Sequence, residues 1–416
     1  MAVLRTKVRL HRMAGAVLLV ALLLLGPGWP GKTGLADGPP PGEEGAATSG
    51  DLAEATARVD FALKSEAAVL MDVVTGQVLY AKEPHKKWAP ASLTKILTLA
   101  LACEALAQGK VKPDDMVVAS ENAWEMGGSE IWLEPGEEMP FSDLLLAVAV
   151  GSANDAAVAV AEYLAGSEQK FVEWMNEKAR ALGCKDTHFV NCHGLDDEGH
   201  LTTAYDLALI SRYALGLPEV VRLSTLREAW IRQNTAKKSW LVSRNRLLVT
   251  YPGATGLKTG HTSKAQYCLV GSARRDERQF LAVILGAPDP ATRVREATQL
   301  LNYAFATFTP VVAARGGEEV ARVRVVRGKE RWLPAVAAGD LALSVEKDRA
   351  DKVQKVIEVV PRANAPVRAG DELGIMALHL DGKELARVAL VAARDVPRST
   401  LLGAIGQTIA RFFSVR

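Results

Sequence analysis

Three short polar motifs follow one another along the chain, and each carries side chains suited to acyl transfer. Ser92-Leu-Thr-Lys95 fits S-x-x-K, Ser152-Ala-Asn154 fits S-x-N, and Lys258-Thr259-Gly260 fits K-T-G. A serine hydroxyl is a poor nucleophile until a base removes its proton, and a lysine is such a base once burial or a second cation lowers its pKa. At positions i and i+3 of a helix the two side chains share one face. The motifs therefore indicate serine chemistry without a triad.

Each motif occurs more than once, so its surroundings decide which copy is functional. S-x-x-K recurs at Ser167 and Ser344, S-x-N recurs at Ser120 and Ser243, and K-T-G recurs at Lys32. Ser167 is predicted to be a helix N-cap, because an acidic residue follows it in the first turn. Ser344 falls in a separate β-rich segment. The S-x-N copies at 120–122 and 243–245 lack a loop between two helices.

The first S-x-x-K has the setting that catalysis needs. It opens a long apolar helix, predicted over 91–109, directly after a proline. The N-terminus of a helix supplies the positive dipole end and the unpaired N–H groups that a serine alkoxide and an oxyanion require. Ser92 is therefore the predicted nucleophile and Lys95 its base. Ser152 and Asn154 lie between two predicted helices, which suits side chains presented into a cleft.

The N-terminal segment explains the extra K-T-G copy. Residues 1–36 combine four early cations, an apolar run over 13–25 and small residues at Gly34 and Ala36, which predicts a cleaved secretory signal, with an uncleaved anchor as the alternative. Residues 26–33 also fit the phosphate-loop pattern G-x-x-x-x-G-K-[ST], but three prolines follow where that loop needs a helix. We expect an exported protein at the outer face of the cytoplasmic membrane or in the cell wall.

Composition excludes several classes of protein. The 50 basic and 48 acidic residues leave a net charge of +2, so no nucleic-acid partner is indicated. The chain has no H-E-x-x-H, no G-x-S-x-G and no zinc-spaced cysteines, and His188, His193 and His200 are interpreted as ordinary loop histidines, so neither a metal nor a cofactor is predicted. Cys184 and Cys192 either form a disulfide or belong to a set of four structural thiols.

The predicted elements frame the motifs. Residues 37–56 are a flexible linker, and a hairpin turns at Thr75-Gly76. Alanine-rich helices run to about residue 225, three strands span 256–287 with a turn at 275–277, and a helix follows. Strands at both ends of this region predict one antiparallel sheet flanked by a helical block, within an α/β domain over 57–310.

Two further segments follow Pro310. Residues 311–396 show short alternating runs with glycine turns, which predicts a small all-β domain. Residues 397–416 form a predicted amphipathic helix that either packs on its own domain or lies in a membrane interface, and two phenylalanines with flanking arginines favour the membrane. Its apolar face comprises Leu401, Leu402, Ile405, Ile409, Phe412 and Phe413.

The segments "PASLTK", "GSANDA" and "GLKTGHT", in this order, resemble the active-site motifs of the low-molecular-mass penicillin-binding proteins, the serine D-Ala-D-Ala carboxypeptidases. "FVNCHGLDDEGHLTTAYDLA" and "EIWLEPGE" are similar to segments of the same family. The resemblance implies a serine DD-peptidase/β-lactamase-like fold with a β-rich C-terminal domain and a membrane anchor. Cys192 stands where the family commonly has proline, which puts the rigidity of that loop in doubt.

The resemblance also implies a role for each motif residue. Ser92 would attack the penultimate D-Ala carbonyl, Lys95 would take its proton, and Ser152 with Lys258 would relay a proton to the leaving amine. Asn154 would hold the substrate amide, and the backbone N–H groups of Ser92 and His261 would form the oxyanion hole. Thr259 and Arg293 would bind the terminal carboxylate, with Gly260 and Thr262 beside them in the substrate site.

The implied function is removal of the terminal D-Ala from peptidoglycan pentapeptide stems through an acyl-enzyme on Ser92, with β-lactams acylating the same serine. A β-lactamase is a weaker interpretation, because no E-x-x-L-N segment lies between Asn154 and Lys258. A non-hydrolytic penicillin sensor or wall-binding protein, and a DD-endopeptidase on the same scaffold, remain alternatives.

Overall fold

The computed structural model describes residues 59–399 of the chain. The predicted signal peptide, the phosphate-loop match, the predicted linker and residues 400–416 of the predicted terminal helix lie outside the described residues. Residues 397–399 are described and are not helical, because Arg398 forms a β-bridge with Gly328, so the helix predicted over 397–416 does not begin at 397. No helix within 59–399 is both long and apolar enough to cross a membrane.

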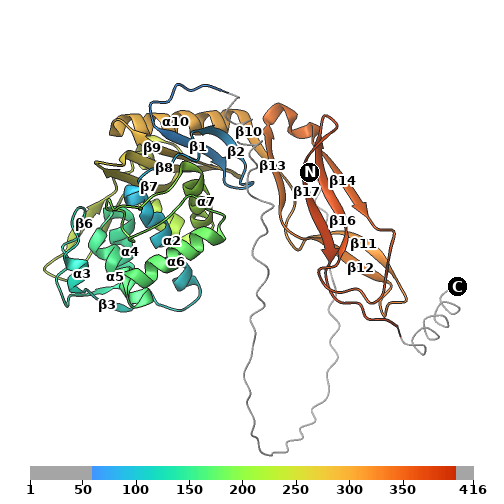
Figure 1. Ribbon diagram of the computed structural model, residues 1–416, viewed down its shortest axis with the longest axis horizontal. Helices are drawn as coiled ribbons and strands as arrows, with labels where there is room; N and C mark the ends of the chain where they lie inside the picture. The colour runs from blue at the N-terminus through green and yellow to red at the C-terminus, as the bar shows by residue number, and fades with distance from the viewer. Residues whose placement is uncertain (1–58, 400–416) are drawn as a thin grey trace, which may run out of the picture. The chain divides into compact units, whose positions relative to one another are not determined.

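A five-stranded antiparallel sheet joins the two ends of the first domain. Its strand order is β2-β1-β9-β8-β7, so a hairpin from the beginning of the domain pairs through β1 with β9 near the end of the domain, where Ala67 lies opposite Leu285 (Figure 1). This confirms the predicted sheet, hairpin and three strands. The strands are β1 (Ala67–Asp72), β2 (Val78–Lys82), β7 (Ala254–Thr262), β8 (Gln266–Arg275) and β9 (Arg278–Ala287).

The sheet is buried on both faces. Alternate residues of β1 divide between two cores: Val69 and Met71 pack with the helical block, whereas Ala68 and Leu70 pack with α10 (Pro290–Thr307). This is the period of two expected of a strand. Figure 1 shows α10 over one face and the helical block over the other.

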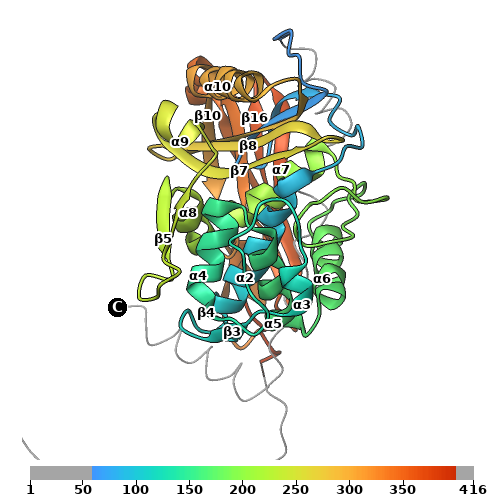
Figure 2. The same ribbon diagram turned by 90° about the vertical axis from the view of Figure 1, so that its left-hand side faces the viewer.

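The helical block carries the first two motifs. Figure 2 views it from the side where α2, α4 and α5 lie below strand β7. Its helices are η2 (Ala91–Thr94), α2 (Lys95–Ala107), α3 (Glu121–Trp124), α4 (Phe141–Leu146), the π-helical turn η3 (Ala147–Gly151), α5 (Asn154–Ala165), α6 (Glu168–Ala181), α7 (Ala204–Leu215) and α8 (Pro218–Ser224).

Two short hairpins interrupt the helices. Strands β3 (Met116–Val118) and β4 (Glu138–Pro140) pair, as do β5 (Glu228–Ile231) and β6 (Ser239–Val242), and α9 (Leu247–Thr250) follows. The sequence did not predict the β5–β6 hairpin, whose strands are only four residues long.

The predicted all-β domain is confirmed and has a core of its own. Strand β10 (Phe308–Ala314) pairs with β13 (Leu341–Glu346), and six strands form a second sheet in the order β14-β16-β17-β12-β11-β15. These strands are β11 (Glu319–Val326), β12 (Trp332–Ala337), β14 (Gln354–Val359), β15 (Arg362–Asn364), β16 (Glu372–Leu380) and β17 (Lys383–Ala392), and a 3₁₀ turn, η4 (Lys347–Lys352), follows β13.

All four cysteines are free and buried, so Cys184 and Cys192 form no disulfide and the four-thiol interpretation holds. Burial raises the pKa of each thiol, to about 12 for Cys103 and Cys268. Such thiols are unreactive packing groups.

Candidate active site

Ser92 and Lys95 meet at the start of a buried helix. Ser92 lies in η2, and Lys95, the first residue of α2, is 0% exposed. The Lys95 Nζ donates to Ser92 Oγ at 3.4 Å, to Asn154 Oδ1 at 2.5 Å and to the His193 carbonyl oxygen at 2.5 Å. The predicted i, i+3 contact is therefore present, and a lysine buried in the helical block has three acceptors.

The ionisation of Lys95 suits a base. Burial lowers the pKa of its ammonium group from 10.5 to about 7, although the charge of Asp155 acts in the opposite direction. Near neutral pH a substantial fraction of Lys95 is thus uncharged and able to accept the proton of Ser92.

A strained turn presents the S-x-N motif. The π turn η3 ends at Ser152, whose backbone is left-handed (φ 63°, ψ 29°) and which is 6% exposed. Helix α5 then begins at Asn154, as predicted. A left-handed non-glycine residue persists only where its surroundings enforce it, and such residues gather at functional sites.

The loop before β4 fixes the Asn154 amide. Asn154 Nδ2 donates to the Gly127 carbonyl oxygen at 2.5 Å, and its backbone N–H donates to the Ser129 carbonyl oxygen at 2.7 Å. These contacts turn the amide oxygen toward Lys95. The first two motifs therefore form one hydrogen-bonded unit.

The K-T-G strand lies close to the nucleophile. Gly260 of β7 has no room for a side chain, because an added Cβ would lie 3.0 Å from Ala91 Cβ and 3.2 Å from the Ser92 backbone nitrogen. Thr259 is 8% exposed, and its carbonyl oxygen accepts a 3.3 Å hydrogen bond from Lys258 Nζ. The strand thus brings the third motif beside the first.

A cluster of cations surrounds Lys258. Burial, followed by the charges of Lys95, Arg244 and Arg293, lowers the pKa of Lys258 well below its usual value. Arg293 projects from α10, and its Nη1 donates to the Gly260 carbonyl oxygen at 2.9 Å and to that of Cys268 at 3.2 Å. Within the described chain none of these cations forms an ion pair with a carboxylate, so an anionic ligand would find complementary charge here.

The residues after Gly260 differ in their contacts. His261 is exposed, with its ring 4.3 Å from the ring of Tyr267. The Thr262 hydroxyl donates to Asp196 Oδ1 at 2.7 Å and accepts from the Ala265 N–H at 3.0 Å. The Thr262 hydroxyl therefore ties the strand end to the 188–203 loop, a contact that the sequence did not indicate.

Two of the three loop histidines, His193 and His200, are buried beside the site, whereas His188 is exposed. His193 Nε2 is 3.5 Å from Glu168 Oε1, and His200 Nε2 is 2.8 Å from Thr94 Oγ1. Burial lowers the pKa of His193 to about 3 and that of His200 to about 4, so both are neutral near pH 7. Among residues 59–399 no group of histidine, cysteine and acidic side chains could hold a metal ion.

The same loop is firmly held despite Cys192. The Cys192 N–H donates to Glu168 Oε1 at 3.1 Å, and its carbonyl oxygen accepts from Thr98 Oγ1 at 2.6 Å. Gly194 (φ 92°) passes so close to η2 that an added Cβ would lie 1.9 Å from the Ala91 carbonyl oxygen. Hydrogen bonds and close packing thus supply order at a position where proline is absent.

Sequence reasoning missed Arg244. It is exposed and contributes to the positive charge around Lys258 and Arg293. The segment "SRNR" at 243–246 holds two arginines and no acid, which was the available signal.

Comparisons with known proteins agree with this arrangement. Residues 53–289 match the family model described as D-alanyl-D-alanine carboxypeptidase, and residues 308–398 match that of the penicillin-binding protein 5 C-terminal domain. The D-alanyl-D-alanine carboxypeptidase DacF of Bacillus subtilis is 39% identical over 351 residues, covering 84% of this chain and 90% of that protein. DacA of Haemophilus influenzae is 33% identical over 348 residues, covering 82% and 87%.

Solved structures give the same result. Penicillin-binding protein 5 from Haemophilus influenzae superposes with a TM-score of 0.74 at 33% identity, covering 81% of this chain and 98% of that chain. Penicillin-binding protein 6B from Escherichia coli superposes with a TM-score of 0.65 at 31% identity, covering 79% and 95%.

Proposed function

Because the chain belongs to the D-alanyl-D-alanine carboxypeptidase family of serine enzymes, we propose that it removes the terminal D-Ala from peptidoglycan pentapeptide stems through an acyl-enzyme on Ser92. The observation that carries the proposal is the contact of Lys95 Nζ with Ser92 Oγ at 3.4 Å in a site where burial lowers the pKa of that lysine to about 7. A neutral lysine within reach of a serine hydroxyl is the minimum apparatus for activating it.

The first half-reaction follows from this pair. Lys95 takes the Ser92 proton while Ser92 Oγ bonds to the carbonyl carbon of the penultimate D-Ala. The backbone N–H groups of Ser92 and His261 receive the oxyanion. Collapse of the tetrahedral intermediate breaks the peptide C–N bond, and the leaving amine takes a proton relayed through Ser152 and Lys258. Free D-Ala departs and the acyl-enzyme remains.

Water completes the turnover. It attacks the ester carbon, its proton passes to the base, and Ser92 Oγ regains a proton as the shortened stem leaves. Asn154 holds the substrate amide throughout, while Thr259, Gly260 and Thr262 line the substrate site. A β-lactam enters the same first step, because its strained amide presents a carbonyl carbon to Ser92.

Positive charge supports recognition of a free C-terminus. Lys258, Arg244 and Arg293 lie near one another without a carboxylate partner in the described chain, and a peptide ending in D-Ala-D-Ala brings a carboxylate. This preference favours a carboxypeptidase over an enzyme that cuts within cross-linked peptides. The chemistry needs no metal or cofactor.

Location and domain boundaries complete the proposal. Residues 1–36 direct export, residues 37–56 tether the catalytic domain of 57–310, and a β-rich domain spans 311–396. The apolar positions of the C-terminal segment, from Leu401 to Phe413, would anchor the protein in the membrane interface. The protein then works at the outer face of the cytoplasmic membrane or in the cell wall. Deletion of residues 398–416 tests this location. We expect the truncated protein to be released from membranes, and continued sedimentation with vesicles would count against the anchor.

The test of function is D-Ala release from a peptide ending in D-Ala-D-Ala, measured with the wild-type secreted part and with Ser92→Ala. We expect release by the wild type and none by the variant. Release at equal rates by both would contradict the role of Ser92. No release by a wild type that still binds penicillin covalently would instead favour a sensor.

A further inference from the structure

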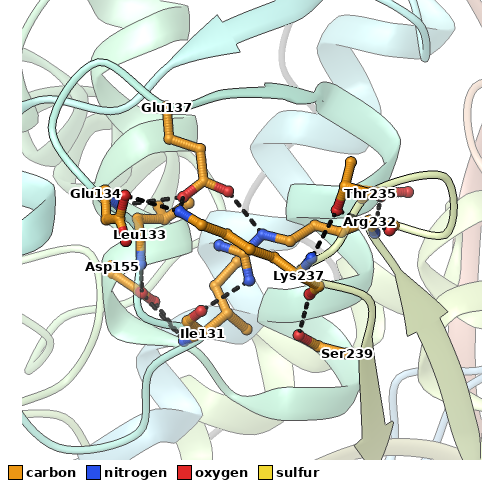
Figure 3. A network of polar contacts seen from close by, with 10 residues as sticks. Ile131, Leu133, Glu134, Glu137, Asp155, Arg232, Thr235, Lys237 and Ser239 are labelled. Atoms are coloured by element: carbon orange, nitrogen blue, oxygen red, sulfur yellow. Dashed lines mark hydrogen bonds and ion pairs between the residues drawn. The ribbon is translucent and has the colours of Figure 1, made fainter.

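A buried arginine lies at the tip of the β5–β6 hairpin, outside the three motifs. Arg232 directly follows β5, is 7% exposed, and has a left-handed backbone with φ 54°. Its side chain leaves its own hairpin and enters the loop between α3 and β4 (Figure 3). A charged, non-glycine residue in this conformation is costly, so its surroundings must hold it there.

Arg232 binds that loop at two points. Its Nε donates to Glu137 Oε1 at 2.7 Å, and its Nη1 donates to the Ile131 carbonyl oxygen at 2.8 Å. Its backbone N–H donates to Asp143 Oδ2 at 2.8 Å, which anchors the residue to α4. Burial acts to raise the pKa of Glu137, but hydrogen bonds from Arg232, the Glu134 N–H and Lys237, together with the charge of Arg232, outweigh it, so the pKa is lowered and the ion pair is maintained.

The loop in turn binds the start of α5. Asp155, which is 1% exposed, accepts hydrogen bonds from the Ile131 N–H at 3.0 Å and the Leu133 N–H at 3.0 Å (Figure 3). Ile131 is therefore bound on one side by Arg232 and on the other by Asp155. The same loop supplies the Gly127 and Ser129 carbonyl oxygens that hold Asn154.

These contacts form a continuous path to the reacting groups. Arg232 fixes residue 131, the loop fixes Asn154, and the Asn154 amide oxygen accepts from Lys95 Nζ at 2.5 Å. We propose that Arg232 is a positioning residue that holds the 127–137 loop and, through it, the Asn154 amide in the geometry needed for acylation of Ser92. The inference rests on the proposed function of that site.

A purely structural role is the competing explanation. Arg232 would then stabilise the hairpin, and its loss would lower the melting temperature without a specific effect on acylation. The two roles differ in how the loss of Arg232 combines with the loss of Asn154, because energetic coupling appears only between residues that act through one another.

The experiment measures the second-order rate of penicillin acylation for the wild type, Arg232→Met, Asn154→Ala and the double variant, with the melting temperature of each. We expect Arg232→Met to lower the rate roughly ten- to hundredfold, the scale expected of a misplacement near 1 Å. In the Asn154→Ala background we expect the same change to cost less than about twofold, since the positioned group is gone.

Two companions keep the test decisive. Arg232→Lys retains a cation for Glu137 but not the fork that also reaches Ile131, so we expect an intermediate rate. It replaces Arg232→Met if that variant does not fold. Lys238→Met is the matched control: its Nζ lies 4.5 Å from the ring of Trp230 on the same hairpin, and the variant should match the wild type.

An Arg232→Met variant that folds and is acylated within about twofold of the wild-type rate would overturn the inference. So would a double variant whose acylation rate falls by the full product of the two single-variant losses, because that result would show no coupling between Arg232 and Asn154. Failure of the proposed function is distinguishable, because the wild type itself would then neither bind penicillin covalently nor release D-Ala.

Discussion

Two buried lysines of the site, Lys95 and Lys258, differ in what surrounds them. Lys95 has three oxygen acceptors, including Asn154 Oδ1 and the His193 carbonyl oxygen. Lys258 Nζ donates to the adjacent Thr259 carbonyl oxygen at 3.3 Å and has other cations as its neighbours. Burial lowers the pKa of both. The difference indicates that Lys95 is preorganised as a base, whereas the charge around Lys258 is left for the substrate to neutralise.

The largest expected effect comes from removing the base. Lys95→Met should lower penicillin acylation and D-Ala release by about a thousandfold, within the range of general-base contributions, although Ser92 is untouched. Stopped-flow acylation measures the loss. Lys170→Met, which removes an exposed lysine of α6, should retain the wild-type rate. Acylation of Lys95→Met within about tenfold of the wild type would show that another group activates the serine.

The cations around Lys258 predict an effect on KM that depends on whether the substrate has a free carboxylate. Arg244→Ala should raise KM roughly ten- to hundredfold for a peptide ending in a free carboxylate, the usual worth of a charged hydrogen bond. The same peptide with a C-terminal amide should have the same KM for the wild type and for Arg244→Ala.

Arg246→Ala is the matched control, because Arg246 is exposed only two residues away. Equal losses for the carboxylate and amide peptides would mean that Arg244 acts on folding rather than on recognition.

The pKa of Lys95 predicts a pH dependence. Acylation should fall by about tenfold per pH unit below a midpoint near 7, since protonated Lys95 cannot accept the serine proton. A pH series of acylation rates measures this limb. A rate that stays flat down to pH 5 would contradict a lysine base.

The same shift predicts a smaller effect on stability. The unfolded chain binds more protons at Lys95 between its ordinary pKa of 10.5 and the folded value of about 7. The free energy of unfolding should therefore rise with pH across this window, by at most about 1.4 kcal/mol per pH unit. Denaturant titrations of the wild type and Lys95→Met should differ in slope, and parallel curves would exclude the shift.

Local spacing made much of the site predictable. Ser92 and Lys95 are one helical turn apart, and Ser152 and Asn154 lie between two apolar helical runs, so local helix geometry places the members of each pair close together. The sheet was equally predictable from the sequence, because strands at both ends of a helical block have few ways to pair. Family resemblance supplied the roles that spacing alone leaves open.

Long-range contacts were not predictable in the same way. The third acceptor of Lys95 comes from residue 193, and the arginine that holds the 127–137 loop comes from residue 232, 101 positions after Ile131. Neither contact produces a periodic pattern in the sequence from which it could be predicted. The left-handed backbone of Ser152 follows from the π turn before it, which propensities do not reveal. Short strands β5 and β6 carried too little pattern to identify the hairpin.

The central claim is that Ser92, activated by Lys95, forms the acyl-enzyme. Its most direct test is peptide mapping by mass spectrometry after brief exposure of the wild type and Ser92→Ala to benzylpenicillin. We expect one penicilloyl adduct per molecule, on Ser92, and none in the variant. An adduct on Ser152 or on any other residue, or undiminished modification of Ser92→Ala, would contradict the account.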